Sequence, residues 1–311
     1  AIPTVKEMDM DNKALRHYPG RVADVGGVPV LRALPQRGRR MVGAWCFLDH
    51  AGPSHFESGP GMQVGPHPHT CLQTFTWMIE GEILHRDSLG SEQPIRPGQV
   101  NLMTAGKGIA HSEESLGKPD FHAVQLWIAL PKEQRFMPPR FQHYPQLPRL
   151  HEQGLQMTVL AGEWLGQQAP TEVHSPLVAV DMEAEQATRA TLALRPDFEY
   201  AVLCLYGDLQ VNGEPAPSNE LVYLPDGQST VDLQCGAGSR CILLGGTPYE
   251  GGVMIWWNFV GQSQQEIEGF LHDWQRGEGF GAPVASPLPP LVAPSLEGVH
   301  LRSPGEAAAA D

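Results

Sequence analysis

Glycine and proline occur so often in this chain that they set the first limit on its fold. The sequence holds 34 glycines and 29 prolines among 311 residues. Proline interrupts helices and glycine weakens them, whereas short strands joined by turns tolerate both residues. Hydrophobic residues make up 41% of the chain, which is enough for a sizeable core. The sequence therefore predicts a folded, all-β protein.

Charge is distributed unevenly between the two halves. Residues 1–150 carry 16 Lys and Arg against 14 Asp and Glu, whereas residues 151–311 carry 5 against 21. Because an acidic surface repels phosphates, we expect no direct binding to nucleic acid.

The five cysteines lack a CxxC pair, which is typical of reduced thiols, and no apolar run reaches the ~20 residues of a membrane span. The polar start at residues 1–13 shows no leader pattern, so we expect a cytoplasmic protein.

Two blocks of sequence are separated by a proline-rich connection. We predict an N-terminal domain over residues 15–135, a C-terminal domain over residues 150–281, and a tail over residues 282–311. Each block contains a strand, a tight glycine turn and a second strand, FTWMIEGEILH in the first and YAVLCLYGDLQV in the second. The shared order of these pieces predicts a duplicated β-sandwich unit.

A helical pattern is clearest in residues 262–281, where Ser263 is a candidate N-cap and Gly277 a candidate stop. Its apolar residues recur at intervals of three or four: Ile267, Phe270, Leu271 and Trp274. We expect this helix to pack against the C-terminal domain. The tail is rich in proline and alanine, so we expect it to be either disordered or laid across the surface as an extended strap.

Histidine is the residue type that most clearly indicates a functional site in this sequence. Seven of the 13 histidines fall between residues 50 and 122: His50, His55, His67, His69, His85, His111 and His122. If residues 67–79 form one strand, His67 and His69 share a face with Phe75 and Trp77. Two imidazoles in an apolar interior are costly unless their nitrogens are satisfied, and a divalent metal satisfies them.

A second element, TAGKGIAHSEES, supplies His111 and, two residues later, Glu113. Together His67, His69, His111 and Glu113 give three imidazoles and one carboxylate, a set that suits Fe(II), Mn(II), Ni(II), Cu(II) or Zn(II). The set lacks the thiolates of a closed structural zinc site and leaves coordination positions open, which favours a catalytic metal over a structural one. Sequence motifs of serine hydrolases, zinc proteases and nucleotide-binding loops are absent.

Longer stretches around these motifs resemble one family. GMQVGPHPH matches the first cupin signature, and HRDSLG, MTAGKGIAHSEE and VMIWWNFVGQSQQEIEGFLHDW resemble segments of the pirin family of bicupins. The resemblance spans residues 15–280. It implies two tandem cupin domains of jelly-roll type with a short C-terminal helix, and one mononuclear metal, usually iron, in the N-terminal domain. It also implies that the four residues named above are the metal ligands.

The activity implied by the resemblance is that of a dioxygenase that cleaves flavonols such as quercetin, with a flavonol-like aromatic substrate and dioxygen as partners. We expect Glu113 to accept the substrate's hydroxyl proton, and Phe75, Trp77 and Trp45 to line an aromatic pocket. The alternative is an iron- or redox-dependent regulatory protein that binds a transcription factor or a metabolic enzyme. The C-terminal block has no HxH, so we expect that domain to hold no metal.

Two positions near the ligands call for separate expectations. Many family members have Glu where this chain has Gln73, which is expected to retune the pocket. Cys71 falls on the predicted ligand face, and we expect it to be a neutral core thiol.

The other histidines are not expected to be catalytic. We expect His50 and His55 to lie in loops, and His85 to belong to a local polar cluster with Arg86 and Asp87. His122 could orient a ligand.

Overall fold

A computed structural model describes residues 14–304 of the protein. Residues 1–13, on which the expectation about a leader rests, and residues 305–311 of the tail lie outside the described part. The described chain is all-β, as predicted, with the α-helix α2 (Gln264–Arg276) and the short helix η1 (Lys132–Gln134). Within residues 14–304, no helix has the length and apolar character that crossing a membrane requires.

Two compact units make up the chain, each assembled from separate stretches. The first unit comprises residues 22–32, 46–146 and the described part of 250–311. The second comprises the described part of 1–21 together with 33–45 and 147–249. Domain boundaries drawn along the sequence, such as 15–135 and 150–281, stay a prediction.

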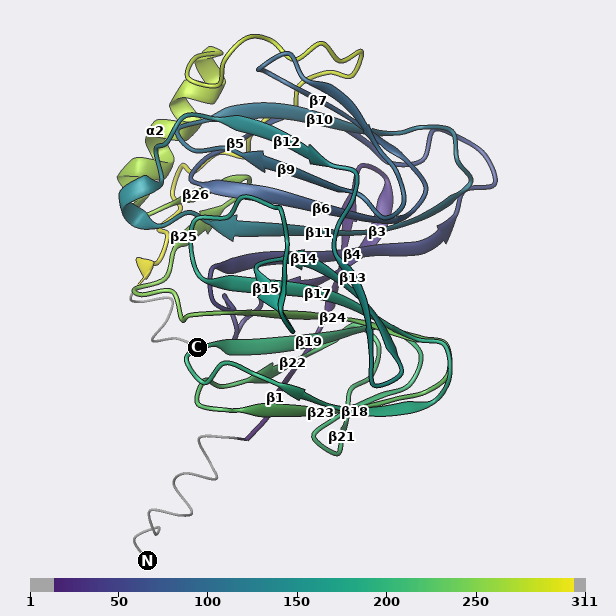
Figure 1. Cartoon of the computed structure of the whole chain (residues 1–311). Coiled ribbons are helices and arrows are strands. Elements are labelled where there is room, and N and C mark those ends of the chain that lie inside the picture. Colours follow the sequence, from purple (N-terminus) through teal and green to yellow (C-terminus); the bar gives the residue numbers. More distant parts are fainter. Residues whose placement is uncertain (1–13, 305–311) are drawn as a thin grey trace, which may run out of the picture. The chain divides into compact units, whose positions relative to one another are not determined.

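The first unit is built from two sheets and a hairpin (Figure 1). The larger sheet has the order β12-β9-β6-β11-β4-β3-β2, and the smaller has the order β5-β10-β7-β8. The strands of the larger sheet are β2 (Arg21–Val25), β3 (Val28–Leu34), β4 (Trp45–His55), β6 (Leu72–Glu80), β9 (Val100–Thr104), β11 (Asp120–Ala129) and β12 (Arg140–Tyr144). Those of the smaller sheet and the hairpin are β5 (Gln63–His69), β7 (Ile83–Asp87), β8 (Glu92–Ile95), β10 (Ile109–Ser115), β25 (Met254–Trp256) and β26 (Phe259–Gly261).

The second unit also has a large and a small sheet, with the orders β1-β22-β19-β24-β17-β14-β13 and β18-β23-β20-β21. The strands of its large sheet are β1 (Arg16–Pro19), β13 (Arg149–Glu152), β14 (Leu155–Ala161), β17 (Leu177–Ala184), β19 (Glu199–Tyr206), β22 (Glu220–Leu224) and β24 (Ser239–Gly246). The remaining strands are β15 (Glu163–Trp164), β16 (Gln167–Gln168), β18 (Thr188–Ala193), β20 (Leu209–Val211), β21 (Glu214–Pro215) and β23 (Thr230–Cys235).

The same strand order occurs in both units. The series β9-β6-β11-β4 of the first unit corresponds to β22-β19-β24-β17 of the second, and β5-β10-β7-β8 corresponds to β18-β23-β20-β21. The two turn-linked strand pairs singled out in the sequence occupy equivalent places, as β6 with β7 and β19 with β20. The repeat confirms the predicted pair of cupin domains.

Apolar side chains occupy the place in the second unit that corresponds to the histidines of the first. Ala190 and Leu192 of β18 lie opposite Leu233 and Val231 of β23, and all four are buried in one core. These strands are the counterparts of β5 and β10. The duplicated units have therefore diverged in their interiors while keeping the same strand order.

The strand predicted over residues 67–79 is wrong in one respect, because the chain breaks it at Cys71. β5 ends at His69 and β6 begins at Leu72, and Cys71 between them has a left-handed φ of 61°. The Cys71 N–H donates to the Gly106 carbonyl at 2.7 Å, which holds this conformation. The two strands enter different sheets, so the alternation of side chains does not carry across the break.

The C-terminal helix forms as predicted but packs elsewhere. Ser263 caps α2 by accepting a backbone N–H, and Gly277 ends it with a φ of 69°. Ile267 and Leu271 of α2 are buried in the first unit, in a core that also contains Ala110 of β10. The expected packing against the C-terminal domain is therefore wrong. An apolar stripe shows that a helix is buried but does not identify its neighbour.

Residues 282–304 run along the first unit as an extended strap, one of the two alternatives expected for the tail. The Leu291 N–H donates to the Pro66 carbonyl of β5 at 2.8 Å, and Trp274 Nε1 of α2 donates to the Leu291 carbonyl at 3.0 Å. β5 is an edge strand of the smaller sheet. The strap therefore covers part of an edge that would otherwise be open to pairing with another chain.

We predict that Ser263→Ala lowers the free energy of unfolding by about 1 kcal/mol, because it removes the side-chain hydrogen bond at the start of α2. Urea unfolding followed by circular dichroism measures the change. Gln275→Ala, on the exposed surface of the same helix, is the control and should change stability by less than about 0.5 kcal/mol. Equal effects of the two substitutions would contradict the capping role.

Candidate metal centre

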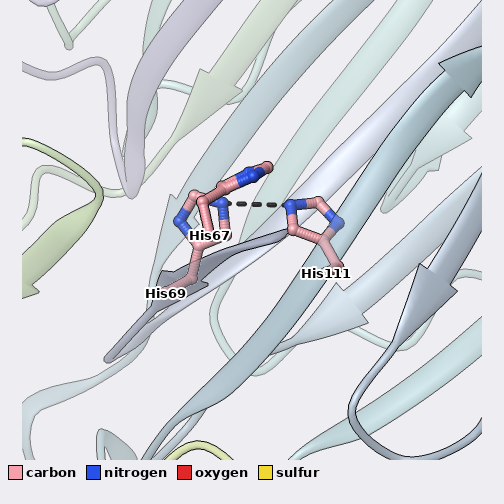
Figure 2. A group of neighbouring side chains, drawn as sticks. All are labelled: His67, His69 and His111. Atoms are coloured by element: carbon pink, nitrogen blue, oxygen red, sulfur yellow. Dashed lines mark hydrogen bonds between the residues drawn. The ribbon is translucent and has the colours of Figure 1, made fainter. Parts of the chain in front are cut away.

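Three of the predicted ligands come together between β5 and β10. His67 lies directly opposite His111 in the register of the two strands, and His69 lies two residues further along β5 on the same face. One ring nitrogen of each histidine lies within 4.8 Å of those of the other two, and all three residues are buried (Figure 2). The strand pairing thus converts two short motifs into one cluster.

A hydrogen bond at Nδ1 orients each of the three rings. His67 Nδ1 donates to the Gly65 carbonyl at 2.8 Å, and His69 Nδ1 donates to the Asn258 carbonyl at 3.0 Å. His111 Nδ1 lies 3.4 Å from His85 Nδ1. A neutral imidazole carries one N–H, so a ring that donates from Nδ1 presents a lone pair at Nε2. This arrangement is typical of metal-binding histidines.

The short contact between His69 and His111 indicates that the site suits a metal ion. Their Nε2 atoms lie 3.2 Å apart, along the dashed line in Figure 2. With both protons held at Nδ1, two lone pairs face each other in a buried place, which is unfavourable unless a cation lies close to both. A divalent metal held by three imidazoles removes the conflict, so the donor set fits such an ion.

Burial keeps the three imidazoles neutral, which is the form that binds metals. It lowers the pKa of His67 to about 4. Burial lowers the pKa of His69 and of His111 well below the usual value, and positive charge on the neighbouring histidines would lower both further.

Glu113 lies beside the cluster rather than within it. A bulge on β5 shifts the register between His111, which pairs with His67, and Glu113, which pairs with Val64. Glu113 Oε1 is 3.7 Å from His111 Nε2, but Glu113 does not belong to the group of candidate ligand atoms that all lie within 4.8 Å of one another. Burial raises the pKa of its carboxyl to about 7. That Glu113 is a ligand stays a prediction.

Asp87 and His85 form a hydrogen-bonded chain that ends at His111 Nδ1. His85 is buried, and its Nε2 donates to Asp87 Oδ2 at 2.7 Å. Its Nδ1 is therefore left to accept from His111 Nδ1. Burial alone would raise the pKa of Asp87, but hydrogen bonds from His85 and from Ser91 hold it below the usual value. The sequence indicated the polar pair of His85 and Asp87 but not its connection to a ligand.

The remaining histidines form pairs of their own. His50, expected in a loop, lies within β4 and is buried, and its Nε2 is 2.7 Å from His122 Nε2 on β11. His55 at the end of β4 is paired with Asp120 at 2.7 Å, where both side chains are largely exposed.

The aromatic residues expected to line the pocket face elsewhere. Trp45 Nε1 donates to the carbonyls of Val178 and Gly245 within the second unit. On β6, Met78 points into the core shared with the smaller sheet, so Phe75 and Trp77 point to the opposite face. The expectation for these three residues is therefore wrong, and the break at Cys71 is the reason for the last two. Sequence reasoning missed the aromatic residues that do approach the cluster, Trp127 at 5.2 Å from His69 and Phe141 at 4.1 Å from His85.

Gln73 and Cys71 also point away from the histidines. Gln73 shares the face of Phe75 on β6 and donates from Nε2 to Thr104 Oγ1 at 2.9 Å. The Cys71 Sγ lies 3.9 Å from Glu266 Oε1, and burial raises the pKa of the thiol to about 12. The thiol is therefore neutral, as expected, whereas the predicted place of Cys71 on the ligand face is wrong.

Two family models match this chain, Pirin over residues 27–128 and the Pirin C-terminal cupin domain over residues 179–281. Together they cover more than half of the sequence, one in each half. The chain belongs to the pirin family. The resemblance predicted from the histidine motifs is confirmed.

Relatives match this pirin over most of its length. It is 54% identical over 287 residues to a Pseudomonas aeruginosa protein named "Putative quercetin 2,3-dioxygenase", with 91% of this chain and 90% of the relative covered. It is 38% identical to a pirin-like protein of Caulobacter vibrioides, with 84% of this chain and 92% of the relative covered. The crystal structure of a quercetin 2,3-dioxygenase from Acinetobacter baumannii matches with a TM-score of 0.91 at 46% identity, covering 93% of this chain and 98% of that chain.

We predict that Asp87→Asn weakens divalent-metal binding by about ten- to a hundredfold, because His85 and then His111 lose the partner that holds their protons in place. Competition with a metal-binding dye measures the dissociation constant. Asp120→Asn is a matched control, since it alters another His–Asp pair of the same unit at an exposed place. A dissociation constant that changes equally in both variants would contradict the supporting role of Asp87.

Proposed function

We propose that this pirin is an iron-dependent dioxygenase that cleaves flavonols such as quercetin. The observation that carries the proposal is the cluster of three histidines whose Nδ1 hydrogen bonds leave the Nε2 lone pairs for a metal. His67, His69, His111 and Glu113 are the proposed ligands. Similarity to the quercetin 2,3-dioxygenase of A. baumannii supports the substrate class and the use of dioxygen.

Iron(II) is the proposed metal, and Mn(II), Ni(II), Cu(II) and Zn(II) are the alternatives that the donor set also suits. A redox-active metal held here supplies the acidification of a substrate hydroxyl and the electron transfer that lets dioxygen react with an electron-rich ring. The protein's part is to hold the ligands in place and to surround them with a dry, shaped interior. Burial of all three histidines provides such an interior.

Aromatic side chains would hold the ring of the substrate. Trp127 lies 5.2 Å from His69, and Phe47 stacks on Trp127 with ring centroids 4.1 Å apart. Flat apolar surfaces of this kind favour a planar aromatic molecule and exclude water.

Glu113 is the proposed acceptor of the substrate's hydroxyl proton. Its Oε1 is 3.7 Å from His111 Nε2, and its side chain is 13% exposed, so the carboxylate lies beside the ligands without being fully enclosed. A carboxylate in this place can act as a general base toward a hydroxyl held near the histidines. The regulatory alternative, in which the protein binds a transcription factor or a metabolic enzyme, stays a prediction.

We predict that natively purified protein contains about one metal ion per chain and that it consumes dioxygen when quercetin is added. Elemental analysis gives the metal content, and an oxygen electrode with loss of quercetin's visible absorption gives the activity. His69→Ala should lose most of both, whereas the exposed His55→Ala should keep them. Metal-loaded protein that leaves quercetin unchanged in air would overturn the proposed activity.

We predict that Glu113→Gln lowers kcat for quercetin by about a hundredfold or more, because an amide cannot accept the hydroxyl proton. Oxygen uptake at saturating quercetin measures the change, at metal loading verified by elemental analysis. Glu114→Gln is the control, since Glu114 is the next residue on β10 and its side chain pairs with Arg86 instead. A fully loaded Glu113→Gln enzyme with normal kcat would rule out the role as a base.

A further inference from the structure

The larger sheet of the first unit turns one face toward the histidines. At one end of this face, Trp127 of β11 approaches His69 and Phe141 of β12 stacks on His85. At the other end, Met78 of β6 packs in a core with residues of the smaller sheet. Because alternate residues of a strand share a face, the side chains two and four positions from each of these also lie on it.

Three rows of side chains cross this inner face. The row nearest the histidines is mainly apolar and aromatic: Phe47, Trp127, Thr74, Met103 and Phe141. The row furthest from them is apolar and belongs to the core: Val30, Ala51, Ala123 and Met78. An ordinary sandwich interior would continue in the same way between these two rows.

The middle row is polar instead. It takes one residue from each of six strands: Arg32, Asp49, Gln125, Thr76, Asn101 and His143. The strand register places Thr76 directly opposite both Gln125 and Asn101, and Asn101 opposite His143. We call these six residues the polar row.

Internal hydrogen bonds order the polar row. Thr76 Oγ1 donates to Gln125 Oε1 at 2.6 Å, and His143 Nδ1 donates to Asn101 Oδ1 at 2.7 Å. These bonds use the amide oxygens of Gln125 and Asn101, so the groups that take no part in them are Gln125 Nε2, Asn101 Nδ2 and His143 Nε2. The row therefore presents donors and an acceptor toward the interior beyond the histidines.

The polar row carries no net charge. Arg32 binds Asp49 through two hydrogen bonds, at 2.7 and 2.8 Å, so their charges cancel. Partial burial lowers the pKa of His143, and the charge of Arg96 lowers it further, so this imidazole is neutral. Neutral donors and acceptors match hydroxyl and carbonyl groups, whereas a carboxylate or a phosphate would need an unpaired cation.

We propose that the polar row recognises the hydroxyl groups of a planar aromatic substrate at the end remote from the metal. Rows on one face of a strand are two residues apart, about 7 Å, which is the reach of one further ring beyond the reacting oxygen. The reacting end lies at the histidines, the rings lie against Phe47 and Trp127, and the remote hydroxyls bind Thr76, Asn101 and Gln125. This inference rests on the proposed function and adds the feature of the substrate that is selected.

Two flavonols test the inference, quercetin with hydroxyls on its outer rings and 3-hydroxyflavone without them. Dissociation constants are measured without oxygen on iron(II)-loaded protein, by fluorescence titration. Thr76→Val and Asn101→Leu should each weaken quercetin binding by roughly five- to tenfold and leave 3-hydroxyflavone binding unchanged. Thr104→Val is the matched control, since Thr104 lies on the opposite face of β9 and bonds Gln73. It should change neither constant.

Equal weakening of both flavonols, or no weakening of quercetin, would overturn the role of the polar row. Unchanged binding of 3-hydroxyflavone shows at the same time that the variants are folded. Oxygen uptake by the wild-type protein tests the proposed function separately, because binding selectivity is read without turnover. A wild-type protein that binds neither flavonol would overturn both.

Discussion

Two imidazole nitrogens that face each other with their lone pairs are the constraint on which the centre depends. The 3.2 Å between Nε2 of His69 and Nε2 of His111 is tolerable only with a positive charge nearby, since the Nδ1 hydrogen bonds prevent either ring from turning its N–H inward. The Nδ1 atoms of the three rings donate to three kinds of partner. These are a carbonyl of the same strand, a carbonyl from the C-terminal segment, and a histidine that is itself bonded to a carboxylate. The orientation of the three rings thus depends on residues outside the histidine cluster.

Duplication is consistent with a histidine cluster in the first unit and an apolar core at the equivalent place in the second. Both units use the same strand order, and in the second unit the strands equivalent to β5 and β10 carry alanine, valine and leucine inside. An apolar interior stabilises a sandwich without further conditions. The first unit replaces part of that interior with histidines and with the polar row, whose groups need partners to be stable.

The all-β fold and the histidine motifs could be predicted from the sequence, and the incorrect predictions have physical reasons. HxH and HxE each place their two side chains on one face of a strand, so His67 could be grouped with His69, and His111 with Glu113, from their spacing. The register that puts His67 opposite His111 depends on the pairing of β5 with β10, which spacing does not give. The break at Cys71 could not be predicted, because a left-handed residue other than glycine leaves little trace in the sequence. Alternation carried across the break therefore predicts the wrong face for Phe75 and Trp77. Asn258 supports His69 through its backbone carbonyl, 189 residues away in sequence, which no side-chain pattern reveals.

That carbonyl has a consequence for how the protein is made. His67, His69 and His111 emerge early during synthesis, whereas the Asn258 carbonyl, β26 and the strap along β5 come from the last fifth of the chain. Domains tend to fold from the N-terminus onward as they leave the ribosome. In this pirin a nascent first cupin has all its imidazoles but not the group that orients one of them. The hydrogen bond that orients His69 therefore forms only after most of the chain has been translated.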